Sequence, residues 1–214
     1  MKRENFTIGG EVIKPGEQKR LQLQMPPLYT DTSMGIPVFV QHGKRAGPTL
    51  FVSAAIHGDE LNGIEIVSRL IKTRAIKNIR GTLIAIPMVN VYGVLNQSRY
   101  LPDRRDLNRC FPGSKKGSLA GRIARLFLDE IVSKCDFGID LHTGAIHRSN
   151  LPQIRANLDD PITREIAEAF GVPVLLNADI RDGSLRQAAA DEGAKVLLYE
   201  AGQALRYDEF SISA

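Results

Sequence analysis

Three residues that could bind a metal ion or move a proton follow apolar runs in this chain of 214 residues: His57, His142 and Glu200. Each run reads as a buried strand, and the carboxyl ends of parallel strands lie at one edge of a sheet. The three side chains are therefore predicted to converge. Glu60 stands three residues after His57, a spacing that lets both side chains reach one point.

Each motif also has an ordinary structural interpretation. The turn His57 to Glu60 could simply begin a helix, with its acidic residues at the positive helix end. His142 could be a hydrogen-bonded histidine in a turn after a strand. Two histidines and one carboxylate with an open fourth position are, however, the ligand set of hydrolytic zinc enzymes. Glu200 would then supply the general base that such a site needs.

The elements that must position these residues alternate along the chain. The apolar run 50–56 passes into residues 61–71, where apolar side chains recur with a helical period. Further strands are predicted at 81–89, 137–141, 172–176 and 195–199, and further helices at 118–132, 161–170 and 184–191. This alternation predicts an α/β fold, with a mainly parallel or mixed sheet flanked by helices on both faces. Within residues 6–48, segments such as 20–25 and 36–41 alternate with period two, which predicts an antiparallel N-terminal edge.

A length of 214 residues is within the range of a single domain, so one domain is expected over residues 1–214. The hydrophobic content of 43% is enough to bury a core. No apolar run is long enough to cross a bilayer, so we expect no membrane partner. The two cysteines, Cys110 and Cys135, form no disulfide framework, and a cytoplasmic protein is expected. The sequence is compatible with a homo-oligomer.

The net charge of +4 does not predict nucleic-acid binding, because most basic residues are interspersed with acidic ones. The exception is the segment Arg99 to Arg109, which also contains Arg104 and Arg105. Such a short arginine-rich loop favours a small anionic ligand, since guanidinium groups pair with carboxylates. Arg104 and Arg105 are expected to be solvated.

Five ordered motifs carry a resemblance to a known family: His57-Gly58-Asp59-Glu60, Ser98-Arg99, Asp106-Leu107-Asn108-Arg109-Cys110-Phe111-Pro112-Gly113, Asp140-Leu141-His142-Thr143-Gly144 and Glu200-Ala201-Gly202. In this order they resemble the succinylglutamate desuccinylase and aspartoacylase family, which is related to the zinc carboxypeptidases. The resemblance spans residues 50–202. It implies a zinc carboxypeptidase-like fold.

The resemblance also implies a role for each site residue. One zinc ion would be bound by His57, Glu60 and His142, with Asp106 orienting a zinc-bound histidine. Glu200 would act as general base and then general acid, and Arg99 would hold the oxyanion. Asn108 and Arg109 would bind a substrate carboxylate.

The implied reaction is hydrolysis of the amide bond of a small anionic N-acyl amino acid, such as N-succinylglutamate or N-acetylaspartate. A carboxypeptidase acting on short peptides would need the same groups. A metal-binding or ligand-binding module without catalysis is a further alternative. It arises because the family's β-rich C-terminal domain is expected to be absent or truncated here.

Overall fold

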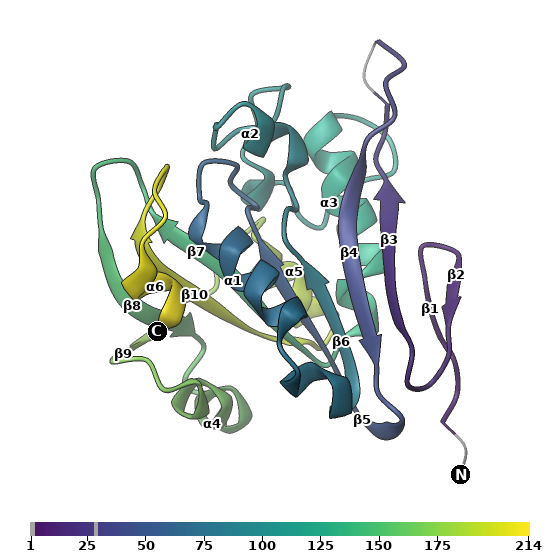
Figure 1. Cartoon of the computed structure of the whole chain (residues 1–214). Helices are drawn as coiled ribbons and strands as arrows, with labels where there is room; N and C mark the ends of the chain where they lie inside the picture. Colours follow the sequence, from purple (N-terminus) through teal and green to yellow (C-terminus); the bar gives the residue numbers. More distant parts are fainter. Residues whose placement is uncertain (1–2, 28–29) are drawn as a thin grey trace.

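The computed structural model describes residues 3–27 and 30–214, and its central feature is an eight-stranded mixed sheet (Figure 1). The strand order is β3-β4-β6-β5-β7-β10-β8-β9, and β1 and β2 pair in a separate small sheet. The strands are β1 (Phe6–Ile8), β2 (Glu11–Ile13), β3 (Gln18–Gln24), β4 (Gly35–His42), β5 (Arg45–Ala54), β6 (Arg80–Ile86), β7 (Phe137–Gly144), β8 (Asn150–Ala156), β9 (Val174–Asn177) and β10 (Lys195–Gln203).

Four adjacent strands at the centre of the sheet, β6, β5, β7 and β10, are parallel to one another. On one side, β4 pairs antiparallel with β6, and β3 pairs antiparallel with β4. On the other side, β8 pairs antiparallel with β10. The parallel centre places the carboxyl ends of β5, β7 and β10 together at one edge.

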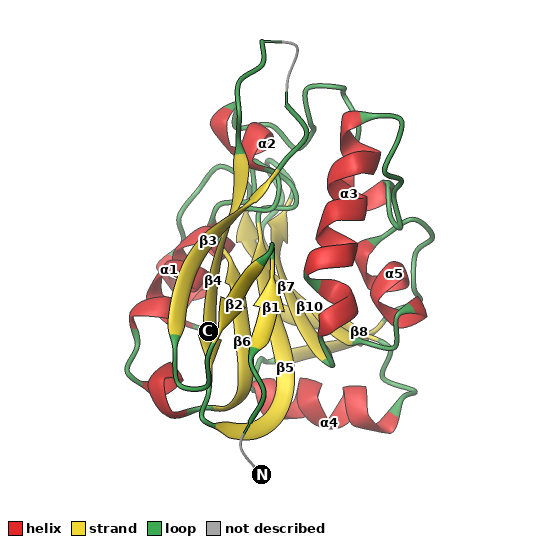
Figure 2. Ribbon diagram, turned by 90° about the vertical axis from the view of Figure 1, so that its right-hand side faces the viewer, coloured by secondary structure: helices red, strands yellow, loops and turns green. Residues whose placement is uncertain are grey.

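Helices cover both faces of this sheet (Figure 2). One hydrophobic cluster joins the sheet to α3 and α5, and the other joins it to α1 and α4. The helices are α1 (Asn62–Lys72), α2 (Val91–Leu95), α3 (Leu119–Glu130), α4 (Pro161–Phe170), α5 (Leu185–Asp191) and α6 (Glu209–Ser213), with 3-10 turns at Ala75–Asn78, Leu107–Arg109 and Val132–Lys134. Within the part of the chain that is described, no helix has the length and apolar character needed to span a membrane.

Side-chain caps define where three of the helices begin. The hydroxyl of Ser118 accepts a hydrogen bond from the Gly121 amide at the start of α3, and Ser184 does the same at α5. At α4, Asp160 is the cap, Pro161 fills the first turn, and Gly171 ends the helix with a φ of 84°. These short-range signals explain why the helix positions were readable from the sequence.

The predicted fold class is confirmed, including the antiparallel N-terminal edge formed by β3 and β4. Residues 28 and 29 of the predicted edge region lie outside the described residues. One strand was not predicted: β8 contains Pro152, and its residues form neither an apolar run nor a strict alternation of apolar and polar side chains. His42 ends β4, is buried, and its Nδ1 lies 2.8 Å from the Thr82 hydroxyl.

Phe127 of α3 gives a test of the larger hydrophobic cluster. Its ring is fully buried and meets Phe51 and Phe111 edge to face, at centroid distances of 6.1 and 6.4 Å. Replacing Phe127 with Ala should lower the free energy of unfolding by about 3–5 kcal/mol, because it leaves a cavity. Urea titration measures this free energy. In the control variant Leu95→Ala the free energy of unfolding should change by no more than about 0.5 kcal/mol, since Leu95 is 69% exposed. Equal losses in both variants would contradict this account of the core.

Candidate active site

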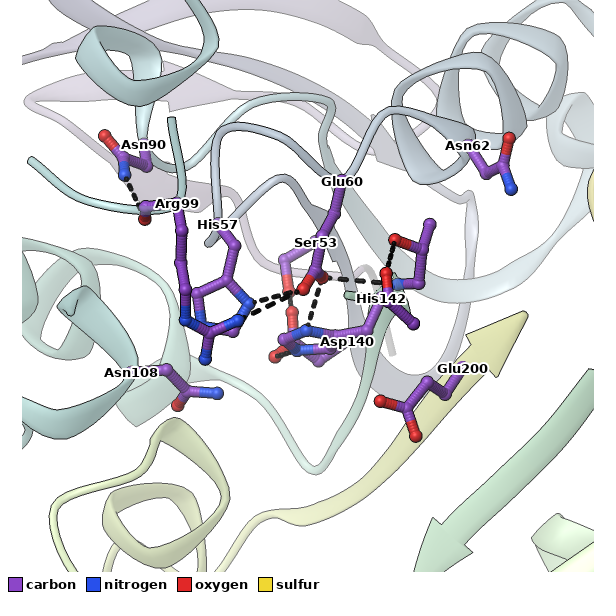
Figure 3. Close-up of polar contacts among 12 residues, drawn as sticks. Ser53, His57, Glu60, Asn62, Asn90, Arg99, Asn108, Asp140, His142 and Glu200 are labelled. Carbon is purple, nitrogen blue, oxygen red and sulfur yellow. Dashed lines mark hydrogen bonds and ion pairs between the residues drawn. The ribbon is translucent and has the colours of Figure 1, made fainter. Parts of the chain in front are cut away.

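The three predicted metal ligands lie together at the carboxyl edge of the parallel strands (Figure 3). Glu60 lies between the two histidines: its Oε1 is 2.8 Å from Nδ1 of His57, and its Oε2 is 2.8 Å from Nδ1 of His142. One ligand atom from each residue lies within 4.8 Å of the others, and all three side chains are buried. The arrangement can hold a single ion.

Sheet register and a tight turn produce this convergence. Ala54 at the end of β5 pairs with Leu141 of β7, so the residues that follow reach the same edge. The turn closes with a 3.2 Å hydrogen bond from the Glu60 amide to the His57 carbonyl. Gly58 is required within it, because a Cβ there would lie 1.9 Å from the carbonyl carbon of Gly93 in α2.

The outer nitrogen of each imidazole also contacts a carboxylate. Nε2 of His57 lies 3.1 Å from Asp106, and Nε2 of His142 lies 2.7 Å from Asp140. Ser53 on β5 donates a 2.8 Å hydrogen bond to the other oxygen of Asp140. Such partners fix the orientation of a ligating imidazole. Asp106 thus lies beside His57, and its role at a zinc-bound histidine stays a prediction.

The role of Asp140 was not predicted, although its sequence position carries a signal. Asp140 precedes His142 by two residues in β7, and residues two apart in a strand project from the same face. An aspartate in that position can therefore reach the histidine ring. The alternation of Asp140 and His142 could have identified the pair.

The surroundings of the cluster favour an ionised Glu60 and protonated His57 and His142. Burial opposes ionisation of Glu60, but the charges and hydrogen bonds of His142 and His57 outweigh burial and lower the pKa of Glu60 to about 2. Burial likewise opposes protonation of the two histidines. The surrounding carboxylates outweigh that effect too, so the pKa of His57 is raised and that of His142 is raised well above its usual range.

The donor set fits zinc. Two imidazole nitrogens and one carboxylate are ligands that zinc accepts, and the outer imidazole nitrogens are already held by carboxylates. The Nδ1 atoms of His57 and His142 both face Glu60, so protons on these atoms occupy the space that a cation needs. A divalent ion would replace that positive charge.

Arg99 approaches the cluster from the loop after α2. Its Nε and Nη2 contact Asp106 at 3.2 and 2.9 Å. Its Nη1 lies 3.5 Å from Oε1 of Glu60. Arg99 is therefore held over the predicted metal site by two carboxylates, with Nη1 directed towards the cluster.

Asn108 and Arg109 lie in the 3-10 turn that follows Asp106. The side-chain oxygen of Asn108 accepts a 2.8 Å hydrogen bond from the Leu185 amide at the start of α5. This bond fixes the amide orientation, and among the described residues Nδ2 has no hydrogen-bond partner. Arg109 donates to the Asn108 carbonyl, and burial lowers the pKa of its guanidinium.

Glu200 lies on β10, paired in register with His142 of β7. Figure 3 shows its carboxylate on the side of the cluster away from Asn90 and Arg99. Its Oε2 accepts a 3.0 Å hydrogen bond from Gln153 and lies 2.8 Å from Nε of Arg155. Both partners come from β8, the strand that was not predicted.

A cavity of about 480 Å³ connects these groups. Seven of the eight predicted site residues line it: His57, Glu60, Arg99, Asn108, Arg109, His142 and Glu200. The eighth, Asp106, is placed by its contact with His57. The lining contains more arginines than acidic residues: Arg99, Arg109, Arg148, Arg155, Arg181 and Arg186 against Glu60, Asp140, Asp179 and Glu200. The cavity is suited to an anion.

The raised pKa values of His57 and His142 predict that the affinity for zinc depends on pH. Below these pKa values both imidazoles are protonated, so zinc must displace their protons and binds more weakly as the pH falls. As the pH falls below these raised pKa values, the affinity measured with a chromophoric chelator should fall, towards a limiting slope of about 100-fold per pH unit for two competing protons. The His147→Ala variant, altered at an exposed turn, should show the same slope. An affinity independent of pH would exclude these histidines as the ligands.

Comparison with known proteins identifies relatives of this chain. A curated relative, the N-alpha-acetyl-L-2,4-diaminobutyric acid deacetylase of Halomonas elongata, is 30% identical over 187 residues, which is 82% of this chain and 54% of the relative. The chain therefore spans about half the length of that relative.

Two solved structures show the same fold. The succinylglutamate desuccinylase/aspartoacylase of Rhodobacter sphaeroides has a TM-score of 0.81 and 26% identity, covering 92% of this chain and 61% of that one. The product-bound ectoine utilisation protein EutE (DoeB) of Ruegeria pomeroyi has a TM-score of 0.82 and 28% identity. The match covers 92% of this chain and 63% of that one. Residues 46–214 match the Succinylglutamate desuccinylase/Aspartoacylase catalytic domain. The chain belongs to the succinylglutamate desuccinylase/aspartoacylase family.

Proposed function

We propose that this chain is the catalytic part of a zinc-dependent deacylase that hydrolyses the amide bond of an N-acyl amino acid. The observation that carries the proposal is the presence of Glu200 beside the His57, Glu60 and His142 cluster in one cavity. Family membership supports the same reaction class. A buried ligand set beside a carboxylate base is the arrangement that metal-assisted hydrolysis requires.

In this proposal His57, Glu60 and His142 hold one zinc ion. When bound, zinc supplies positive charge that polarises the substrate carbonyl and lowers the pKa of water. Asp106 and Asp140 keep the two imidazoles oriented through their Nε2 atoms.

Protein side chains carry out the proton transfers and bind the developing charge. Glu200 accepts a proton from the attacking water through Oε1 and later returns it to the nitrogen of the leaving amine. Arg99 donates from Nη1 to the carbonyl oxygen as that oxygen gains negative charge. The products are a free carboxylate and a free amino acid.

Asn108 and Arg109 would bind the α-carboxylate of the amino acid. The Leu185 amide fixes the orientation of the Asn108 side chain, and Nδ2 has no hydrogen-bond partner among the residues that the structure describes. The excess of arginine in the cavity lining favours an anionic substrate. N-succinylglutamate and N-acetylaspartate have the required charge, and the N-acetyl group also matches the substrate named for the Halomonas elongata relative.

Replacing Glu200 with Gln tests the reaction class. The variant should bind zinc in the same stoichiometry as the wild type but lose about 100-fold to 10,000-fold in kcat, because the general base is removed. The matched control Glu165→Gln changes an exposed residue of α4 and should keep full activity. Turnover is measured on zinc-loaded protein with N-acetyl and N-succinyl amino acids and with dipeptides. Faster release from dipeptides would indicate a carboxypeptidase, and zinc binding without turnover would indicate a noncatalytic module.

Replacing Arg109 with Gln tests the carboxylate anchor. The variant should raise KM for an N-acyl amino acid by about tenfold or more, because a charge-assisted hydrogen bond is lost. It should leave the slower hydrolysis of the matching α-carboxamide substrate unchanged, since that compound has no α-carboxylate to bind. An equal loss on both substrates would show that Arg109 acts in some other way.

A further inference from the structure

We propose that Arg155 is a positioning residue that fixes the carboxylate of Glu200 in the orientation needed for proton transfer. This inference rests on the proposed function, because it assigns Arg155 a role through the proposed base. Nε of Arg155 lies 2.8 Å from Oε2 of Glu200. The cavity is lined by both side chains.

The pairing of β8 with β10 brings the two residues together. Gln153 lies directly opposite Glu200, and Arg155 lies opposite Leu198. Residues two apart on a strand share one face, so Gln153 and Arg155 both project on the side of Glu200. Two donors from one strand therefore hold a carboxylate on the neighbouring strand.

Both donors contact the same oxygen of Glu200. Gln153 donates to Oε2 at 3.0 Å, and Arg155 also contacts Oε2. Among the described residues, no hydrogen bond or ion pair involves Oε1. The carboxylate thus has one restrained oxygen and one oxygen free to exchange a proton. Restraining a general base in this way lowers the entropic cost of reaching a reactive geometry.

Two other arginines that line the cavity have different partners. Arg99 pairs with Asp106, and Arg186 donates to the carbonyl oxygens of Ala178 and Asp179. Within residues 3–27 and 30–214, Arg155 is the arginine whose ion pair is with Glu200. Its side chain is partly exposed, so its replacement should not unfold the protein.

The test is the Arg155→Met variant, which removes the donors and keeps most of the aliphatic stem. Positioning through Glu200 predicts a fall in kcat of about tenfold to 100-fold, a fraction of the full general-base effect, with KM changed by less than about twofold. Arg155→Lys should recover part of the loss, because an ammonium group can still donate to Oε2. The control Arg164→Met alters an exposed arginine of α4 and should behave as the wild type.

A double-mutant cycle separates positioning from substrate binding. In the Glu200→Gln background, Arg155→Met should cause no further fall in kcat beyond about twofold, because residues that act as a unit are not additive. A rise in KM of equal size in both backgrounds would overturn the proposal and make Arg155 a substrate anchor. An unchanged kcat in Arg155→Met would also overturn it.

Crystal structures of the zinc-loaded wild type and Arg155→Met distinguish this inference from the proposed function. If the wild type hydrolyses no acyl amino acid, the proposed function fails, but the structures still test the orientation of Glu200. A rotated Glu200 carboxylate in Arg155→Met supports positioning. An identical side-chain conformation in both proteins refutes it.

Discussion

The site depends on the burial of one carboxylate between two imidazoles. Removing Glu60 from water is costly unless positive charge and hydrogen bonds surround it. His57 and His142 contact one oxygen each, and the Thr143 amide donates to Oε2 at 3.2 Å. The cluster therefore requires either protons on both imidazoles or a cation in their place. Asp106 and Asp140 stabilise positive charge on the imidazoles, and Arg99 adds positive charge near Glu60.

Most of the fold was predictable because its signals are local. Apolar runs located the central strands, and apolar side chains that recur with a helical period located helices. In the structure, the side chains of Ser118, Asp160 and Ser184 cap three of these helices. Strand β8 was missed because its buried positions are taken by Pro152, Ile154 and Ala156, which do not form an apolar run. Only pairing with β10 makes that segment a strand, and pairing is a long-range property.

The site was predictable to the extent that it follows from parallel strands. His57, His142 and Glu200 each follow or end an apolar run, so their convergence required only the direction of the strands. The contact of Arg155 with Glu200 depended on the pairing register of β8 and β10, which the sequence did not specify. The position of Arg155 was also unpredictable because it lies on β8, the strand that was not predicted.

The close approach of Gly58 to α2 has a mechanical consequence. With backbone against backbone and no side chain between them, the turn that carries His57 and the helix Val91–Leu95 cannot slide independently. The side-chain amide of Asn90, the residue just before that helix, also donates from Nδ2 to the backbone carbonyl of Arg99 at 3.4 Å. A displacement of this short helix would therefore shift the imidazole of His57 and the guanidinium of Arg99 together, because α2 contacts the segments that carry both residues.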